Sequence, residues 1–76
     1  MKAFVEFVAR CLVDHPDQVA IEQVQSENSI LIRLKVSEED LGKVIGRNGR
    51  NAQSIRTLLA AIGAKEGKRA ILEITH

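Results

Sequence analysis

Apolar residues recur at two different spacings along the chain, and these spacings separate helical from extended segments. The first segment is amphipathic with helical spacing, and we expect it to end before Pro16, because the residue preceding a proline disfavours the helical conformation. We expect the whole apolar stripe, including both phenylalanines and the cysteine, to be buried. The stripe consists of Phe4, Phe7, Val8, Cys11 and Leu12.

Two extended segments follow, joined by a polar turn. Residues 19–25 predict a strand, although its apolar pattern slips by one position. Residues 26–29 are polar and suit a hairpin turn. Residues 30–36 alternate apolar and polar side chains, which is the period of a strand. We therefore predict an antiparallel hairpin.

A short helix is predicted to begin near Glu38. Ser37 lies three residues before Asp40, as in a capping box, and acidic side chains suit the positive end of a helix. We attribute Glu38, Glu39 and Asp40 to helix capping and not to acid–base chemistry. Gly46 should interrupt this helix.

Apolar spacing resumes between Ala52 and Ile62 and predicts a longer second helix, with Gly63 as its stop. Residues 70–74 alternate again and predict the last strand. The order is α-β-β-α-α-β, and a long crossover leaves the strands that it joins parallel. We predict an α+β fold in which a three-stranded mixed sheet carries helices packed on one face, in a single domain over residues 1–76.

Composition narrows the class of protein. With 45% apolar and 28% charged residues, the chain has globular values, and 76 residues suffice for one small core. A single cysteine excludes an internal disulfide framework, so we expect a cytoplasmic protein. No stretch has the apolar length of a signal peptide or a membrane span, and we expect no contact with a membrane.

The net charge of +1 conceals a strong asymmetry. Residues 1–40 carry four basic and eight acidic side chains, a net charge of −4. Residues 41–76 carry seven basic and two acidic side chains, a net charge of +5. This asymmetry indicates an anionic partner on the second half of the chain. A charged, solvated face is the alternative.

The most informative motif is the segment Gly46-Arg47-Asn48-Gly49 between the two predicted helices. Glycine adopts positive φ and lets another backbone approach closely. The second helix begins just after Gly49, so its unpaired N–H groups should point into the turn and form an anion site. Arg47, Asn48 and Arg50 add donors that suit phosphate. A plain structural turn between two helices is the alternative.

Nucleotide-cofactor motifs are absent. The dinucleotide fingerprint lacks its first glycine, and for a P-loop that starts at Gly42 the required second glycine is Arg47. The two histidines, His15 and His76, belong to no catalytic or metal-ligand pattern, and we expect both to be solvated. We predict no enzyme, no cofactor and no metal.

The chain resembles the small KH-domain proteins of bacteria, the KhpA family, over essentially its whole length. The resemblance is carried by KAFVEFVARCLVDHP, VIGRNGRNAQSIRTLL and KEGKRAILEI. In a KH domain a GXXG loop clamps the backbone of about four nucleotides. The resemblance implies the type II KH fold and binding of single-stranded RNA. It also implies roles as an RNA chaperone and post-transcriptional regulator and in cell shape and cell-wall synthesis, homodimers, and complexes with a larger KH-containing protein.

The resemblance also implies where RNA would bind. The groove would lie between the helix pair and the last strand, with Lys65, Lys68 and Arg69 on its opposite rim. Ala52 is small for a groove floor, and no aromatic residue lies in this region, so we expect weak, salt-dependent binding with little sequence preference. The predicted RNA-binding residues are Gly46, Arg47, Asn48, Gly49, Arg50, Ile45, Ala52, Gln53, Arg56, Lys43, Lys68 and Arg69.

A protein-interaction subunit is the alternative function. The second helix is more apolar than one core-facing stripe requires, so Leu58 and Ala61 should remain exposed. These two residues would pair with another copy or with a second KH protein. Small domains often gain stability in this way.

Overall fold

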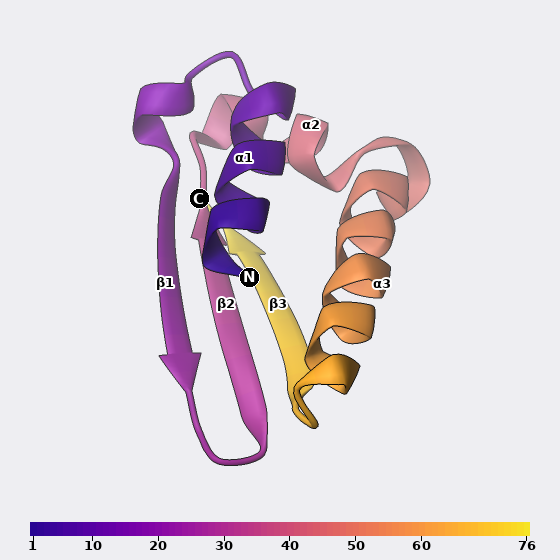
Figure 1. Ribbon diagram of the computed structural model, residues 1–76. Helices are drawn as coiled ribbons and strands as arrows, with labels where there is room; N and C mark the ends of the chain where they lie inside the picture. Colours follow the sequence, from indigo (N-terminus) through magenta and orange to yellow (C-terminus); the bar gives the residue numbers. More distant parts are fainter.

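The computed structural model describes residues 1–76 as a sheet covered by helices (Figure 1). The predicted order of helices and strands is confirmed, with three short 3₁₀ turns between them. The elements are α1 (Lys2–Leu12), a 3₁₀ turn (Pro16–Gln18), β1 (Ala20–Gln25), β2 (Ser29–Lys35), a second 3₁₀ turn (Glu38–Asp40), α2 (Leu41–Ile45), a third (Arg47–Gly49), α3 (Arg50–Lys65) and β3 (Arg69–Thr75).

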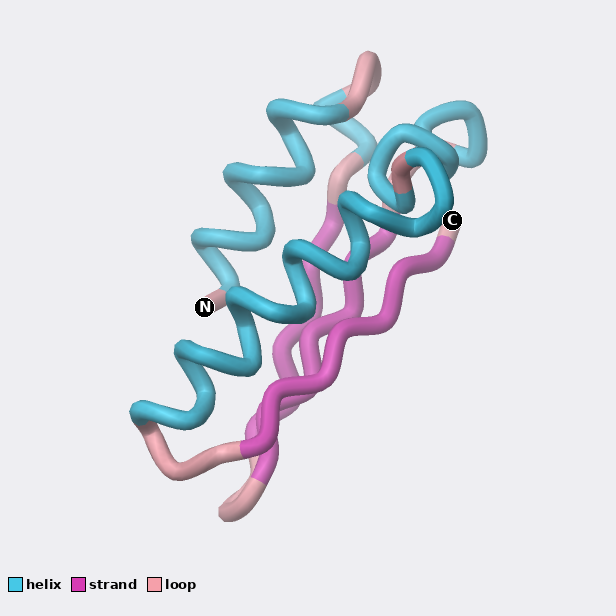
Figure 2. The backbone as a smooth tube through the Cα atoms, turned by 90° about the vertical axis from the view of Figure 1, so that its right-hand side faces the viewer, coloured by secondary structure: helices cyan, strands magenta, loops and turns pink.

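The sheet has the strand order β1-β2-β3. β1 pairs with β2 antiparallel, and β2 pairs with β3 parallel, as the hairpin and the crossover predict. Figure 2 shows the helices on one side of the sheet and the other face uncovered. The predicted mixed sheet with helices on one face is therefore confirmed. No helix is both long and apolar enough to span a membrane.

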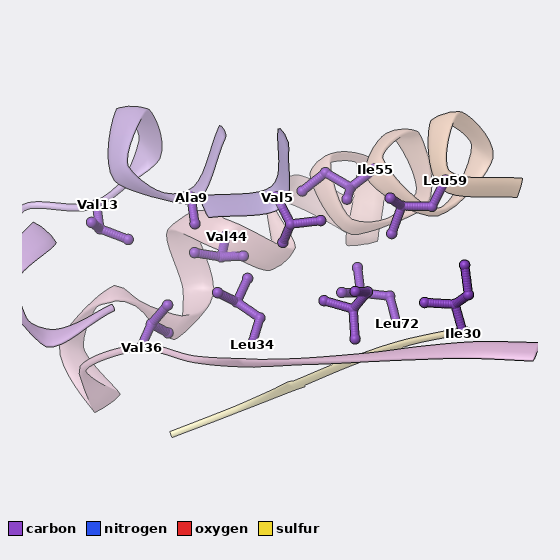
Figure 3. Close-up of a cluster of buried hydrophobic side chains, with 11 residues drawn as sticks. Val5, Ala9, Val13, Ile30, Leu34, Val36, Val44, Ile55, Leu59 and Leu72 are labelled. Atoms are coloured by element: carbon purple, nitrogen blue, oxygen red, sulfur yellow. The ribbon is translucent and has the colours of Figure 1, made fainter. Parts of the chain in front are cut away.

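The core lies between the sheet and the helices (Figure 3). Alternate residues of β2 point into it, because successive side chains of a strand face opposite sides. Burial of each large apolar side chain contributes about 1.5–3 kcal/mol relative to exposure. The buried apolar cluster comprises Val5, Ala9, Val13, Ile30, Ile32, Leu34, Val36, Val44, Ile55, Leu59 and Leu72.

The burial predicted for part of α1 was wrong. Phe7 is 68% exposed and Cys11 is exposed, although Phe4 does pack against the core. The helix rests on the core through Val5 and Ala9. Residues two positions further on lie about 200° around the helix, at 100° per residue, and therefore face outward. The prediction was right for Phe4 and Val8, which pack against the core, but it left out Val5 and Ala9, which are fully buried.

The predicted stop of the second helix was also wrong. α3 continues through Gly63 to Lys65. Gly63 is buried, and a Cβ at this position would lie 2.7 Å from the carbonyl oxygen of Lys68 and 3.2 Å from the Cβ of Ala70. The absence of a side chain lets α3 approach the beginning of β3. Gly63 therefore serves helix–strand packing and not helix termination.

Candidate nucleic-acid interface

The GXXG turn has an unusual backbone. Gly46 has φ +79° and ψ 171°, a region that is essentially restricted to glycine. Asn48 and Gly49 both adopt the left-handed helical region, which asparagine tolerates better than most residues. Three of the four turn residues thus have positive φ. These backbone conformations favour glycine at positions 46 and 49 and asparagine at position 48.

The turn also presents the N-terminus of α3. Gly49 is the N-cap residue, and no side chain caps the helix there. The first N–H groups of a helix have no partners within the helix and carry the positive end of its dipole, although that of Arg50 donates to the carbonyl of Arg47 in the turn. Arg47, Asn48 and Arg50 are exposed around the same point. The structure thus brings together the donors predicted for a phosphate.

Asn51 contacts this turn, but the sequence analysis did not predict a role for it. Its Nδ2 donates a hydrogen bond to the carbonyl oxygen of Lys43, at 2.9 Å. Its side chain also packs on Gly46, where an added Cβ would lie 2.7 Å from the Cγ of Asn51. An amide in the first turn of a helix is the only sequence signal for this contact, and no apolar periodicity includes it.

Other predicted RNA-binding residues lie along α3 and below the turn. Gln53 and Arg56 are exposed and three residues apart, so they share a helix face. The Nη2 of Arg56 lies 3.5 Å from the carbonyl oxygen of Leu72, so this side chain leans over β3. Ile45 is half-buried and the methyl group of Ala52 is buried, which leaves little apolar surface for a base.

The basic residues of the predicted rim lie at the other end of α3. Lys65 ends the helix, and Lys68 and Arg69 lead into β3. A helix of 16 residues is about 24 Å long, at a rise of about 1.5 Å per residue. The turn and the rim are therefore at opposite ends of α3 (Figure 1). One phosphate therefore cannot contact both.

Lys43, which was predicted to bind RNA, forms ion pairs with two acidic residues. Its ammonium group pairs with the carboxylates of Asp14 and Asp40. The hydrogen bond to Asp14 raises the pKa of Lys43 above its ordinary value of 10.5. The structure therefore places the charge of Lys43 beside the connection between α1 and β1, among acids.

Asp40 is fully buried and occupies the N-cap position of α2, but neither its side chain nor that of Ser37 makes a capping hydrogen bond, so the predicted capping box was wrong. Its carboxylate accepts hydrogen bonds from the backbone N–H groups of Asp14 and His15, at 3.2 and 2.9 Å. It also lies 3.0 Å from the Nδ1 of His15. Burial acts to raise the pKa of Asp40, but these hydrogen bonds outweigh burial and leave the pKa below its ordinary value of 3.8.

His15 was predicted to be solvated; its side chain is half-exposed and also lies against Asp40. The hydrogen bond to Asp40 raises the pKa of His15 above its ordinary value of 6.5. This cluster joins residues 25 or more positions apart in the chain. It fixes the end of α1 and the connection after it against the start of α2.

The opposite flank of α3 carries the predicted interaction residues. Leu58 is 51% exposed, and Ala61 is also exposed, as predicted. A groove of about 160 Å³ lies between α1 and α3 on this flank. It is lined by Phe4, Val8, Leu12, Asn51, Ser54, Ile55 and Leu58.

In the sequence, the two helices and their Gly-x-x-Gly turn lie between β2 and β3, which are parallel neighbours in the three-stranded sheet. This arrangement defines a KH domain. The profile of the KhpA/KhpB KH domain matches residues 2–74. The chain belongs to this family.

Relatives match over nearly their full lengths. A protein of Clostridium acetobutylicum named RNA-binding protein KhpA is 50% identical over 97% of this chain and 99% of its own. Proteins of the same name from Caldanaerobacter subterraneus subsp. tengcongensis and Aquifex aeolicus are 51% and 47% identical, each over 97% of this chain and over 99% and 94% of their own. No solved structure matches the chain.

Proposed function

We propose that this chain binds single-stranded RNA and clamps its sugar–phosphate backbone with the GXXG turn. The observation that carries the proposal is the uncapped N-terminus of α3, which Gly49 opens beside the exposed Arg47, Asn48 and Arg50. Its N–H groups and the two guanidinium groups are donors of the kind that phosphate binds. Membership in a family whose relatives are named RNA-binding proteins supports this choice of anion.

The strand would run along α3 from the turn toward Lys68 and Arg69, past Gln53 and Arg56. The exposed aromatic side chain, Phe7, lies on the outer face of α1, so base stacking contributes little. Affinity then depends on phosphate contacts, and each one contributes about −0.7 to the slope of log K against log salt. We expect weak binding with little base preference, which suits an RNA chaperone. We infer that the protein acts in the cytoplasm as a post-transcriptional regulator and affects cell shape and cell-wall synthesis.

Fluorescence anisotropy of a labelled single-stranded RNA across a salt series tests the clamp. The variant R47D/N48D should abolish binding, because it places two carboxylates at the phosphate site. The variant K2D/Q18D changes the charge by the same amount at exposed positions in and after α1, and it should bind nearly as the wild type does. If R47D/N48D binds as tightly as K2D/Q18D, the turn is not the clamp.

A second function is favoured by the exposed Leu58 and the groove beside it. We propose that Leu58 and Ala61 form a dimer interface, or dock a larger KH-containing protein. Sedimentation should show a dimer that the variant L58K weakens, because a charge would then replace a side chain buried in the interface. A monomeric wild type at high concentration would refute the homodimer.

A further inference from the structure

The Asn51 side chain contacts the end of α2 and the first glycine of the GXXG turn. Its Nδ2 donates to the carbonyl of Lys43 in α2, and its Cγ and Cβ pack where a side chain of Gly46 would lie. Asn51 itself belongs to the first turn of α3. One side chain thus ties the end of one helix to the start of the next across the turn.

Within the turn, only backbone hydrogen bonds of the 3₁₀ type hold the chain, from Gly49 to Gly46 and from Arg50 to Arg47. α2 has five residues, which is too short for a helix to be stable by itself. The last four carbonyl groups of a helix lack intrahelical partners, and that of Lys43 is one of them. The neighbouring carbonyl, of Gly42, accepts the N–H of Gly46. The Asn51 amide therefore supplies the hydrogen bond that the carbonyl of Lys43 lacks, and it holds the end of α2 in place.

Glycine adds to the need for such a tie. Gly46 and Gly49 lose more conformational freedom on ordering than other residues do. If the turn were loose before RNA bound, binding would bear this entropy cost. A turn held in place beforehand avoids it.

We propose that Asn51 is a positioning residue, which holds the GXXG turn in the shape that binds phosphate. The inference rests on the proposed RNA-binding function. Loss of the amide should weaken RNA binding about 3- to 10-fold, the effect of one hydrogen bond. The salt slope should stay unchanged, because Asn51 does not itself hold a phosphate.

The variant N51L separates positioning from stability. Leucine has a similar size but no donor, and it would sit beside the apolar Phe4, Val8 and Leu12 of the groove. N51L should therefore unfold at the same or a higher urea concentration than the wild type, yet bind RNA more weakly. Amide hydrogen exchange should be faster in N51L at Gly46 and Gly49, whose N–H groups donate to the carbonyls of Gly42 and Gly46.

T57A is the matched control. Like Asn51, Thr57 lies in α3 and donates a side-chain hydrogen bond to a backbone carbonyl, but its acceptor, Gln53, lies in α3 itself, at 2.9 Å. T57A should leave RNA affinity and turn exchange unchanged. If N51L binds RNA as tightly as the wild type and its turn amides exchange at the same rate, the positioning role is wrong while RNA binding stands. If the wild type binds no RNA, the proposed function fails and the positioning role fails with it.

Discussion

The substitution Gly63→Ala tests how closely α3 packs on β3. The added Cβ would lie 2.7 Å from the carbonyl oxygen of Lys68 and 3.2 Å from the Cβ of Ala70. The first of these partners is backbone, which cannot rotate away as a long side chain would. The clash can be relieved only if α3 and β3 move apart.

Two effects of opposite sign determine the magnitude. Alanine in a helix interior is more favourable than glycine by about 0.8–1.0 kcal/mol. Overpacking of a well-packed site costs about 1–3 kcal/mol. The difference predicts that Gly63→Ala lowers the free energy of unfolding by up to about 2 kcal/mol.

Urea unfolding followed by circular dichroism measures this change, and Gly42→Ala is its control. Gly42 also lies in a helix, but a Cβ there would have no atom within 4 Å. Gly42→Ala should therefore raise the free energy of unfolding by about 0.5–1 kcal/mol. If Gly63→Ala is as stable as Gly42→Ala, the close approach of α3 to β3 is refuted.

Two further predictions concern the ionic cluster and the first helix. The folded pKa of His15 is raised, so His15 stabilises the fold below pH 6.5 and loses this effect as the pH rises through the folded pKa. The folded pKa of Asp40 is lowered, so Asp40 stabilises the fold above pH 3.8 and loses this effect as the pH falls through the folded pKa. Urea midpoints measured across pH should be highest between pH 3.8 and pH 6.5. The variant His15→Ala should reduce the fall of the midpoint above pH 6.5. An unchanged fall would contradict the pairing of His15 with Asp40. Phe7→Ala should change the free energy of unfolding by less than about 0.5 kcal/mol, whereas the fully buried Ile32→Ala should lower it by about 2–5 kcal/mol. Equal losses in thermal or urea unfolding would show that Phe7 is part of the core.

Much of the fold followed from local patterns. The alternation in residues 30–36 predicts β2 within one residue at each end, because a strand with one buried face has a period of two. The Gly46-Arg47-Asn48-Gly49 motif predicts an interruption between two helices, since its backbone requires positive φ. The exposure of Leu58 also followed, because a helix buries one stripe and α3 has more apolar residues than that stripe holds.

The site was predicted less completely, because several of its contacts join distant residues. The placement of Lys43 among acids depends on Asp14, which lies 29 positions away in the chain. The sequence predicts that Asp40 caps a helix, but in the folded chain Asp40 is buried and accepts a hydrogen bond from the backbone N–H of His15. The contact of Asn51 with Gly46 and Lys43 exists only once the turn has closed.

The sequence by itself therefore determined which segments are helices and strands, their order, and the position of the glycine turn. These features depend on periodicity and on backbone conformations that individual residues allow. Only the tertiary structure decided which face of α1 meets the core, that Gly63 admits β3, and which partners Asp40 and Asn51 bind. Periodicity shows that a helix has faces, but the face that is buried depends on how the sheet and the neighbouring helix pack against it.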